Sequence, residues 1–193
     1  MKNSQDNEML FILSIMKSPE IEYNASNIAK LMNISSMGAL KIARKLEKEG
    51  ILSSRKIGVA KIYKVNFNSY SEQYIKFLLK REIEQTSPYV KVWTKELEKI
   101  KSAEAIILFG SVLKKGKEAG DIDTLILVNQ KNFNKIKKEI ESINILNEKK
   151  IHPVFQTKED LEKNIKDKDK VILNAIKGLF ISGEDKLIEV LIK

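Results

Sequence analysis

The 193-residue chain contains no cysteine, a single histidine and three prolines. The lack of cysteine excludes a disulfide-stapled scaffold, a Cys-ligated zinc or iron–sulfur site and thiol catalysis. With His152 as the sole histidine, a His-rich metal site and a Ser-His-Asp triad are disfavoured. No apolar run approaches the roughly 20 residues of a transmembrane helix, and the polar first residues do not predict a signal peptide. We therefore expect a soluble, cytoplasmic protein that does not associate with a membrane.

Positive charge is what the chain has in excess, with 35 basic and 26 acidic residues and a formal net charge of +9. Residues 1–66 carry 11 basic and 6 acidic side chains, whereas residues 67–193 carry 24 and 20. The denser positive charge near the N-terminus favours a polyanionic partner there. Since only three of the basic residues are Arg, a general bias toward lysine is the alternative explanation.

The first third of the chain has the pattern of three helices followed by a β-hairpin. In the second helix, Leu31 is expected to face inward with Ile28 and Ala29. Two stretches of alternating apolar residues then flank Gly58, which predicts the hairpin. The three predicted helices span residues 8–17, 25–32 and about 36–49.

This order of elements resembles the winged helix-turn-helix of archaeal and bacterial regulators of the multiple-antibiotic-resistance and arsenic-repressor type. The likeness rests on residues 26–35 and 46–52 and covers about residues 6–66. It implies that the third helix lies in the major groove of duplex DNA, with Arg44 as the candidate for base readout. The alternative is that these lysines solvate the outer face and that the module docks a protein. The residues implied to face DNA are Ser36, Met37, Lys41, Arg44 and Lys45 on the helix and Arg55, Lys56 and Lys61 on the hairpin.

A connecting segment follows, with a predicted helix over residues 70–85 and a second helix from Pro88 to Lys101. Winged-helix regulators commonly dimerise through helices in such a place. The helix over residues 70–85 is therefore expected either to form a homodimer or to pack within its own chain.

A second pattern predicts chemistry. The apolar run 105–109 predicts a buried strand, and it ends at Gly110 and Ser111, where the backbone can approach a phosphate. Nine residues later Asp121 and Asp123 begin another strand, whose alternation puts both carboxylates on one face. Because adjacent carboxylates repel each other unless a cation lies between them, this pair predicts a divalent-metal site.

This pattern resembles the polymerase-β-type nucleotidyltransferase superfamily in its minimal, prokaryotic form. Phe109, Gly110, Ser111, Asp121 and Asp123 match its motif residue by residue. The resemblance implies that Asp121 and Asp123 are catalytic and bind Mg²⁺ or Mn²⁺. It also implies that Gly110 and Ser111 hold the triphosphate of a nucleotide. Further phosphate contacts are open to Lys114, Lys115 and Lys117, although a solvated loop is the favoured interpretation for at least two of them.

The third carboxylate of that family, on a later strand, is not found. The next strand candidate, residues 149–156, contains no Asp or Glu; Glu148 lies before it, and Glu159 and Asp160 lie after it. We favour the interpretation of His152 in this segment as an edge-strand residue over that of a ligand. The missing carboxylate leaves open whether the site is active or binds a nucleotide without turnover.

The sequence thus predicts an α+β protein with a winged helix-turn-helix (1–67), a connecting helix (68–87) and a nucleotidyltransferase-type α/β domain (88–193) with a small mixed sheet and flanking helices. One function is metal-dependent transfer of a nucleoside monophosphate from a nucleoside triphosphate to a hydroxyl, with DNA binding by the winged helix. The other is a DNA-binding transcriptional regulator or antitoxin whose degenerate nucleotidyltransferase-like domain senses nucleotide or binds a partner. The implied partners are double-stranded DNA, a nucleoside triphosphate, and a toxin or other protein.

Overall fold

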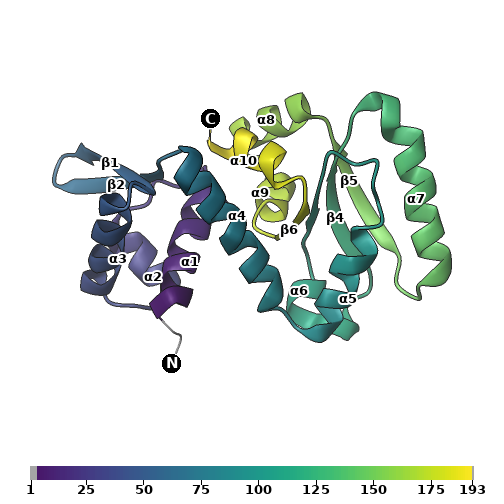
Figure 1. Ribbon diagram of the computed structural model, residues 1–193, viewed down its shortest axis with the longest axis horizontal. Helices are drawn as coiled ribbons and strands as arrows, with labels where there is room; N and C mark the ends of the chain where they lie inside the picture. The colour runs from purple at the N-terminus through teal and green to yellow at the C-terminus, as the bar shows by residue number, and fades with distance from the viewer. Residues whose placement is uncertain (1–3, 193) are drawn as a thin grey trace. The chain divides into compact units, whose positions relative to one another are not determined.

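The computed structural model describes residues 4–192 (Figure 1). The chain folds into two compact units that divide between Leu78 and Leu79. This boundary lies inside helix α4 (Ser69–Glu84), where the sequence predicts the connecting helix. Among the described residues, none of the helices combines the length and the apolar character that crossing a bilayer requires.

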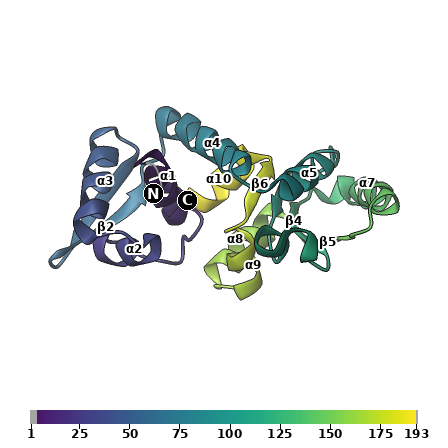
Figure 2. The ribbon, with the colours of Figure 1, turned by 90° about the horizontal axis from the view of Figure 1, so that it is seen from below.

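The first unit consists of three helices, a two-stranded antiparallel sheet and the start of α4 (Figures 1 and 2). The three helices and the hairpin occur in the order that the sequence predicts. Their bounds are α1 (Ser4–Met16), α2 (Ala25–Met32), α3 (Ser36–Lys48), β1 (Leu52–Ile57) and β2 (Ala60–Val65).

Local hydrogen bonds set the ends of α2 and the start of α3. The Asn24 side chain accepts from the backbone N–H groups of Ser26 and Asn27, and the Asn27 side chain accepts from the N–H of Asn24. Asn33 ends α2 in the left-handed conformation with φ of 54°, a role that Asn fills readily. Ser35 then caps α3 by accepting from the N–H of Gly38 at 3.0 Å. The short connection between these caps fixes the turn between the two helices.

The core of this unit includes the fully buried Phe11 of α1. Its ring packs edge-on against the ring of Tyr63, with 6.1 Å between the ring centroids. One prediction for α2 is wrong: Leu31 is exposed, and Met32 occupies the buried position instead. At 3.6 residues per turn Leu31 lies nearly opposite Ala29, whereas Met32 shares the face of Ile28.

The second unit contains a four-stranded sheet in the order β5-β4-β3-β6. Strand β3 pairs antiparallel with both β4 and β6, whereas β4 and β5 are parallel. The prediction of a small mixed sheet is therefore confirmed. The main elements are α5 (Pro88–Leu97), β3 (Ala105–Leu108), α6 (Val112–Lys115), β4 (Ile122–Leu127), α7 (Phe133–Leu146), β5 (Ile151–Gln156), α8 (Lys158–Lys166), α9 (Lys170–Ala175), β6 (Leu179–Ser182) and α10 (Glu184–Ile192).

Alternation along β4 separates the hydrophobic core from the polar end of the strand. Ile122 and Ile126 belong to a buried cluster that also contains Trp93 and Leu97 of α5 and Ile136 of α7. Because side chains alternate across a strand, Asp121 and Asp123 lie on the other face of the sheet. The core under α5 and α7 thus anchors the strand that carries both carboxylates.

Strand β5 forms an edge of the sheet, and it carries a proline. The backbone N–H of Ile122 donates to Lys150 O and that of Val128 to Gln156 O, so the even-numbered residues of this segment face β4. The nitrogen of Pro153 therefore faces away from β4. This is a position at which a strand tolerates proline.

Two buried threonines of this unit predict opposite responses to valine. The Thr94 hydroxyl donates to Lys91 O at 2.8 Å, whereas the Thr124 hydroxyl has no hydrogen-bond partner among residues 4–192. We expect Thr124→Val to raise the free energy of unfolding by about 1 kcal/mol and Thr94→Val to lower it by about the same. Urea unfolding followed by the fluorescence of the single tryptophan, Trp93, measures both. An equal loss of stability in the two variants would contradict the prediction.

Candidate functional site

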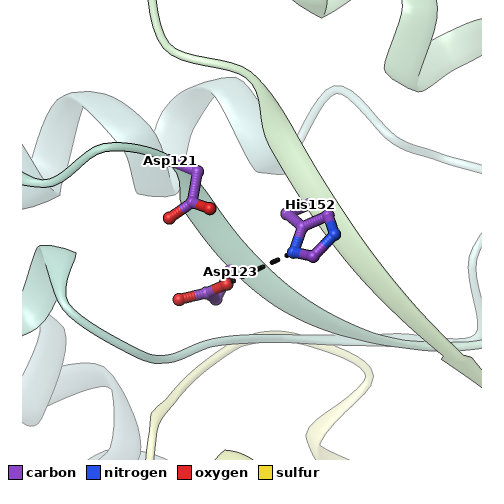
Figure 3. Close-up of side chains that lie close together, drawn as sticks. All are labelled: Asp121, Asp123 and His152. Atoms are coloured by element: carbon purple, nitrogen blue, oxygen red, sulfur yellow. Dashed lines mark ion pairs between the residues drawn. The ribbon is translucent and has the colours of Figure 1, made fainter.

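Three potential metal ligands meet at one end of β4 and β5. Asp121 lies directly before β4, Asp123 is the second residue of β4, and His152 is the second residue of β5. One ligand atom of each lies within 4.8 Å of the others (Figure 3). The closest ion-pair approach is 3.7 Å, between His152 Nδ1 and Asp123 Oδ1.

The geometry of His152 is compatible with both interpretations of this residue, the favoured one of an edge-strand residue and that of a ligand. His152 does lie on an edge strand, as predicted, but its ring points toward Asp123 (Figure 3). The cause is the register of the parallel pair, in which Asp123 is the partner of His152. Directly paired residues on neighbouring strands project from the same face of a sheet.

The close approach of Gly110 to Asp123 defines one wall of this site. Gly110 adopts φ of +82°, and a Cβ built on it would lie 2.0 Å from Asp123 Oδ2. The backbone N–H of Phe109 donates to Asp123 O at 3.0 Å, which holds the end of β3 against β4. Both the backbone conformation and the contact therefore require glycine here.

Ser111 follows Gly110 at the start of α6. Its carbonyl accepts from the N–H groups of Lys114 and Lys115 at 3.0 and 2.8 Å, while its side chain makes no capping hydrogen bond. The hydroxyl of Ser111 is thus not used to begin the helix.

Lys114 is exposed and lines a cavity of about 570 Å³ together with Lys115, Gly116 and Val90 of α5. The lining of this cavity does not include the two aspartates or His152. The structure therefore brings Gly110 and Asp123 together, while Lys114 lines a cavity next to them in the chain.

The strand after β4 carries no carboxylate, and the residue it places beside the aspartate pair is His152. Among residues 4–192, a ring nitrogen of His152 lies within 4.8 Å of a carboxylate oxygen of each aspartate. Glu148 is exposed before β5. Asp160 accepts from Thr157 in the capping box of α8.

These side chains fit a divalent cation. Two carboxylates and an imidazole are ligand types that divalent metals take in proteins. Their mutual repulsion leaves Asp121 and Asp123 in need of a positive charge. A side chain at position 110 would displace the Asp123 carboxylate, and Gly110 keeps this space free.

The predicted DNA-facing residues of α3 and the hairpin are all exposed, but the structure pairs several of their charges with acids. Lys45 Nζ donates to both carboxylate oxygens of Glu8 at 2.8 Å. Arg55 is paired with Glu22, and Lys61 lies 3.4 Å from Glu47.

Lys45 shows the electrostatic consequence most clearly. Its hydrogen bond to Glu8 raises the pKa of Lys45 above the usual value for lysine, against a smaller effect of desolvation. The ammonium stays charged, but a buried acid already balances it. Within the described part of the chain, Lys41, Arg44 and Lys56 form no ion pair. Glu8 could not be recognised from the sequence as the partner of Lys45, because the two residues lie 37 positions apart.

The close approach of Gly110 to Asp123 predicts that a methyl group at position 110 weakens metal binding. We expect Gly110→Ala to displace the Asp123 carboxylate and to weaken Mn²⁺ binding by at least about tenfold. The matched control is Gly116→Ala, where φ is +55° and no atom lies within 4 Å of the added Cβ. Mn²⁺ titration followed by electron paramagnetic resonance measures both. Equal Mn²⁺ affinities in the two variants would contradict the importance of the contact.

Comparison with known proteins gives one family. No curated protein matches the chain in sequence. Residues 91–177 match the family model described as polymerase beta, nucleotidyltransferase. This range includes Gly110, Asp121, Asp123 and His152. The part of the chain that brings these residues together is therefore similar to the nucleotidyltransferases of the polymerase beta family.

Proposed function

We propose that the protein is a metal-dependent nucleotidyltransferase that moves a nucleoside monophosphate from a nucleoside triphosphate to a hydroxyl acceptor. The observation that carries this proposal is the contact of Gly110 with Asp123, next to Asp121. It lies in the part of the chain that is similar to the polymerase beta family.

The proposed roles follow from the chemistry of each group. Asp121 and Asp123 hold the cation, Mg²⁺ or Mn²⁺, which when bound neutralises charge on the α-phosphate and on the leaving pyrophosphate. Gly110 leaves the backbone open to the triphosphate, and the Ser111 hydroxyl donates to a phosphate oxygen. The acceptor oxygen forms a bond to the α-phosphorus as the bond to the bridging oxygen breaks. Lys114 supplies a further phosphate contact.

For the first unit, we propose a winged helix-turn-helix that binds double-stranded DNA. Helix α3 enters the major groove, where an α-helix fits, and the hairpin approaches the flanking phosphates. Three exposed basic residues form no ion pair with an acid of the described residues: Lys41 and Arg44 on α3 and Lys56 on the hairpin. They are the residues best suited to meet a polyanion.

One observation favours a second candidate function. The place of the expected third carboxylate is taken by His152, which an inactive site would also tolerate. In this case the protein is a DNA-binding regulator or antitoxin, active as a monomer or a homodimer. Its second unit then senses a nucleotide or binds a toxin or other protein.

Removal of a carboxylate tests the transfer reaction. We expect Asp121→Asn and Asp123→Asn each to lower the metal-dependent transfer of label from α-labelled nucleoside triphosphates by at least about a hundredfold. The matched control is Glu118→Gln, which removes an exposed charge between Gly110 and Asp121. Label that persists in both aspartate variants would refute the proposed roles. Nucleotide binding without transfer in the unaltered protein would favour the second candidate function.

Salt dependence tests the proposed DNA contacts. We expect Lys41→Ala and Arg44→Ala to weaken binding to the DNA upstream of the coding sequence and to reduce the salt slope by about 1 each. Lys45→Ala has a smaller effect because Glu8 already balances this charge. Lys166→Ala on α8 is the control for the loss of an exposed positive charge. Mobility shifts over a series of salt concentrations give both quantities. Binding that is absent or independent of salt would indicate a protein-docking module.

A further inference from the structure

We propose that Asp121, Asp123 and His152 form a site that selects a transition-metal dication, Mn²⁺ or Zn²⁺, over Mg²⁺. This inference rests on the proposed function in that it concerns the same carboxylates. It differs in assigning His152 as a ligand and in naming the class of metal.

The backbone fixes the place of His152. Asp123 and His152 are direct partners in the parallel ladder of β4 and β5, on the face of the sheet opposite the buried cluster of Ile122 and Ile126. Neighbouring strands are about 4.8 Å apart, so the two side chains start side by side. The position follows from the register of two strands and does not depend on a flexible loop.

The ring of His152 is available to a ligand. Its side chain is 74% exposed, and the approach of Nδ1 to Asp123 is 3.7 Å, beyond the length of a hydrogen bond. Among residues 4–192, no hydrogen bond of the His152 ring is recorded. The imidazole is therefore neither packed into the core nor hydrogen-bonded to the Asp123 carboxylate next to it.

The chemistry of the donors decides between metals. Carboxylate oxygens suit Mg²⁺ and Mn²⁺, whereas imidazole is a favoured ligand of Zn²⁺ and other transition metals. Mg²⁺ also gives up its water reluctantly, so it gains little from a neutral nitrogen. A site with two carboxylates and one imidazole therefore binds Mn²⁺ and Zn²⁺ with three side chains and Mg²⁺ with two.

A titration with metal alone tests the selectivity. The full chain without an affinity tag is titrated with Mn²⁺, observed by electron paramagnetic resonance, and then with Zn²⁺ or Mg²⁺ as competitor. We expect Zn²⁺ to displace Mn²⁺ at a concentration at least about a hundredfold lower than Mg²⁺ does. Comparable concentrations of the two competitors would overturn the proposal.

Three variants assign the effect to His152. We expect His152→Ala to weaken Mn²⁺ and Zn²⁺ binding by at least about tenfold while Mg²⁺ binding changes little. His152→Asp is expected to shift the preference toward Mg²⁺ by about tenfold, because it supplies the oxygen donor that this cation favours. Glu148→Gln, which alters an exposed acid just before β5, is the control and is expected to match the unaltered protein. Wild-type affinities in His152→Ala, or equal changes for all metals, would overturn the proposal.

The single histidine gives a second, independent readout. The imidazole resonances of the chain come from one residue, so their assignment needs no comparison. We expect Zn²⁺ to shift them and Mg²⁺ to leave them in place. The same spectra show whether each variant retains its fold. Because both experiments measure binding, a protein that transfers no nucleotide but passes them would contradict the proposed function alone.

Discussion

The contact between the end of β3 and Asp123 is the constraint on which the site depends. A glycine without a side chain, held at a positive φ, lets one strand end rest against a carboxylate of the next. The N–H of Phe109 secures this approach through Asp123 O, and the register of β5 adds His152 on the other side of β4. Asp123 and His152 are thus placed by strand pairing, while the opposite face of β4 is anchored in the core below α5 and α7.

In the first unit, the arrangement of acids matters as much as the excess of basic residues. In each of these pairs the basic side chain is exposed, although Glu8 itself is buried, and ion pairs at the surface typically contribute only about 0–1 kcal/mol to stability. Their larger consequence is for the electrostatic field, because Glu8, Glu22 and Glu47 cancel positive charge near α3 and the hairpin. The surface of uncompensated positive charge is therefore smaller than the composition of residues 1–66 indicates.

Periodicity was enough to predict the helices and hairpin of the first unit and strands β3, β4 and β5 of the second, since it is a property of neighbouring residues. Helix α2, for example, has the predicted bounds of Ala25–Met32 because Asn24 and Asn33 stop it at both ends. The error at Leu31 came from a helix so short that two faces contain apolar residues. The side-chain neighbours of His152 and Lys45 could not be predicted for another reason. Both depend on the register of β5 or on acids far away in the chain, which no local pattern encodes.

Pro153, one residue beyond His152, has a consequence for how this protein meets other molecules. Its nitrogen faces the open edge of β5 and has no hydrogen to donate, so the ladder of hydrogen bonds that an added strand would need is interrupted there. An added strand, whether an extended peptide or the same edge of another copy, would lose a hydrogen bond at this point. Pro153 thus weakens the edge of β5 as a template for β-augmentation beside Asp123 and His152.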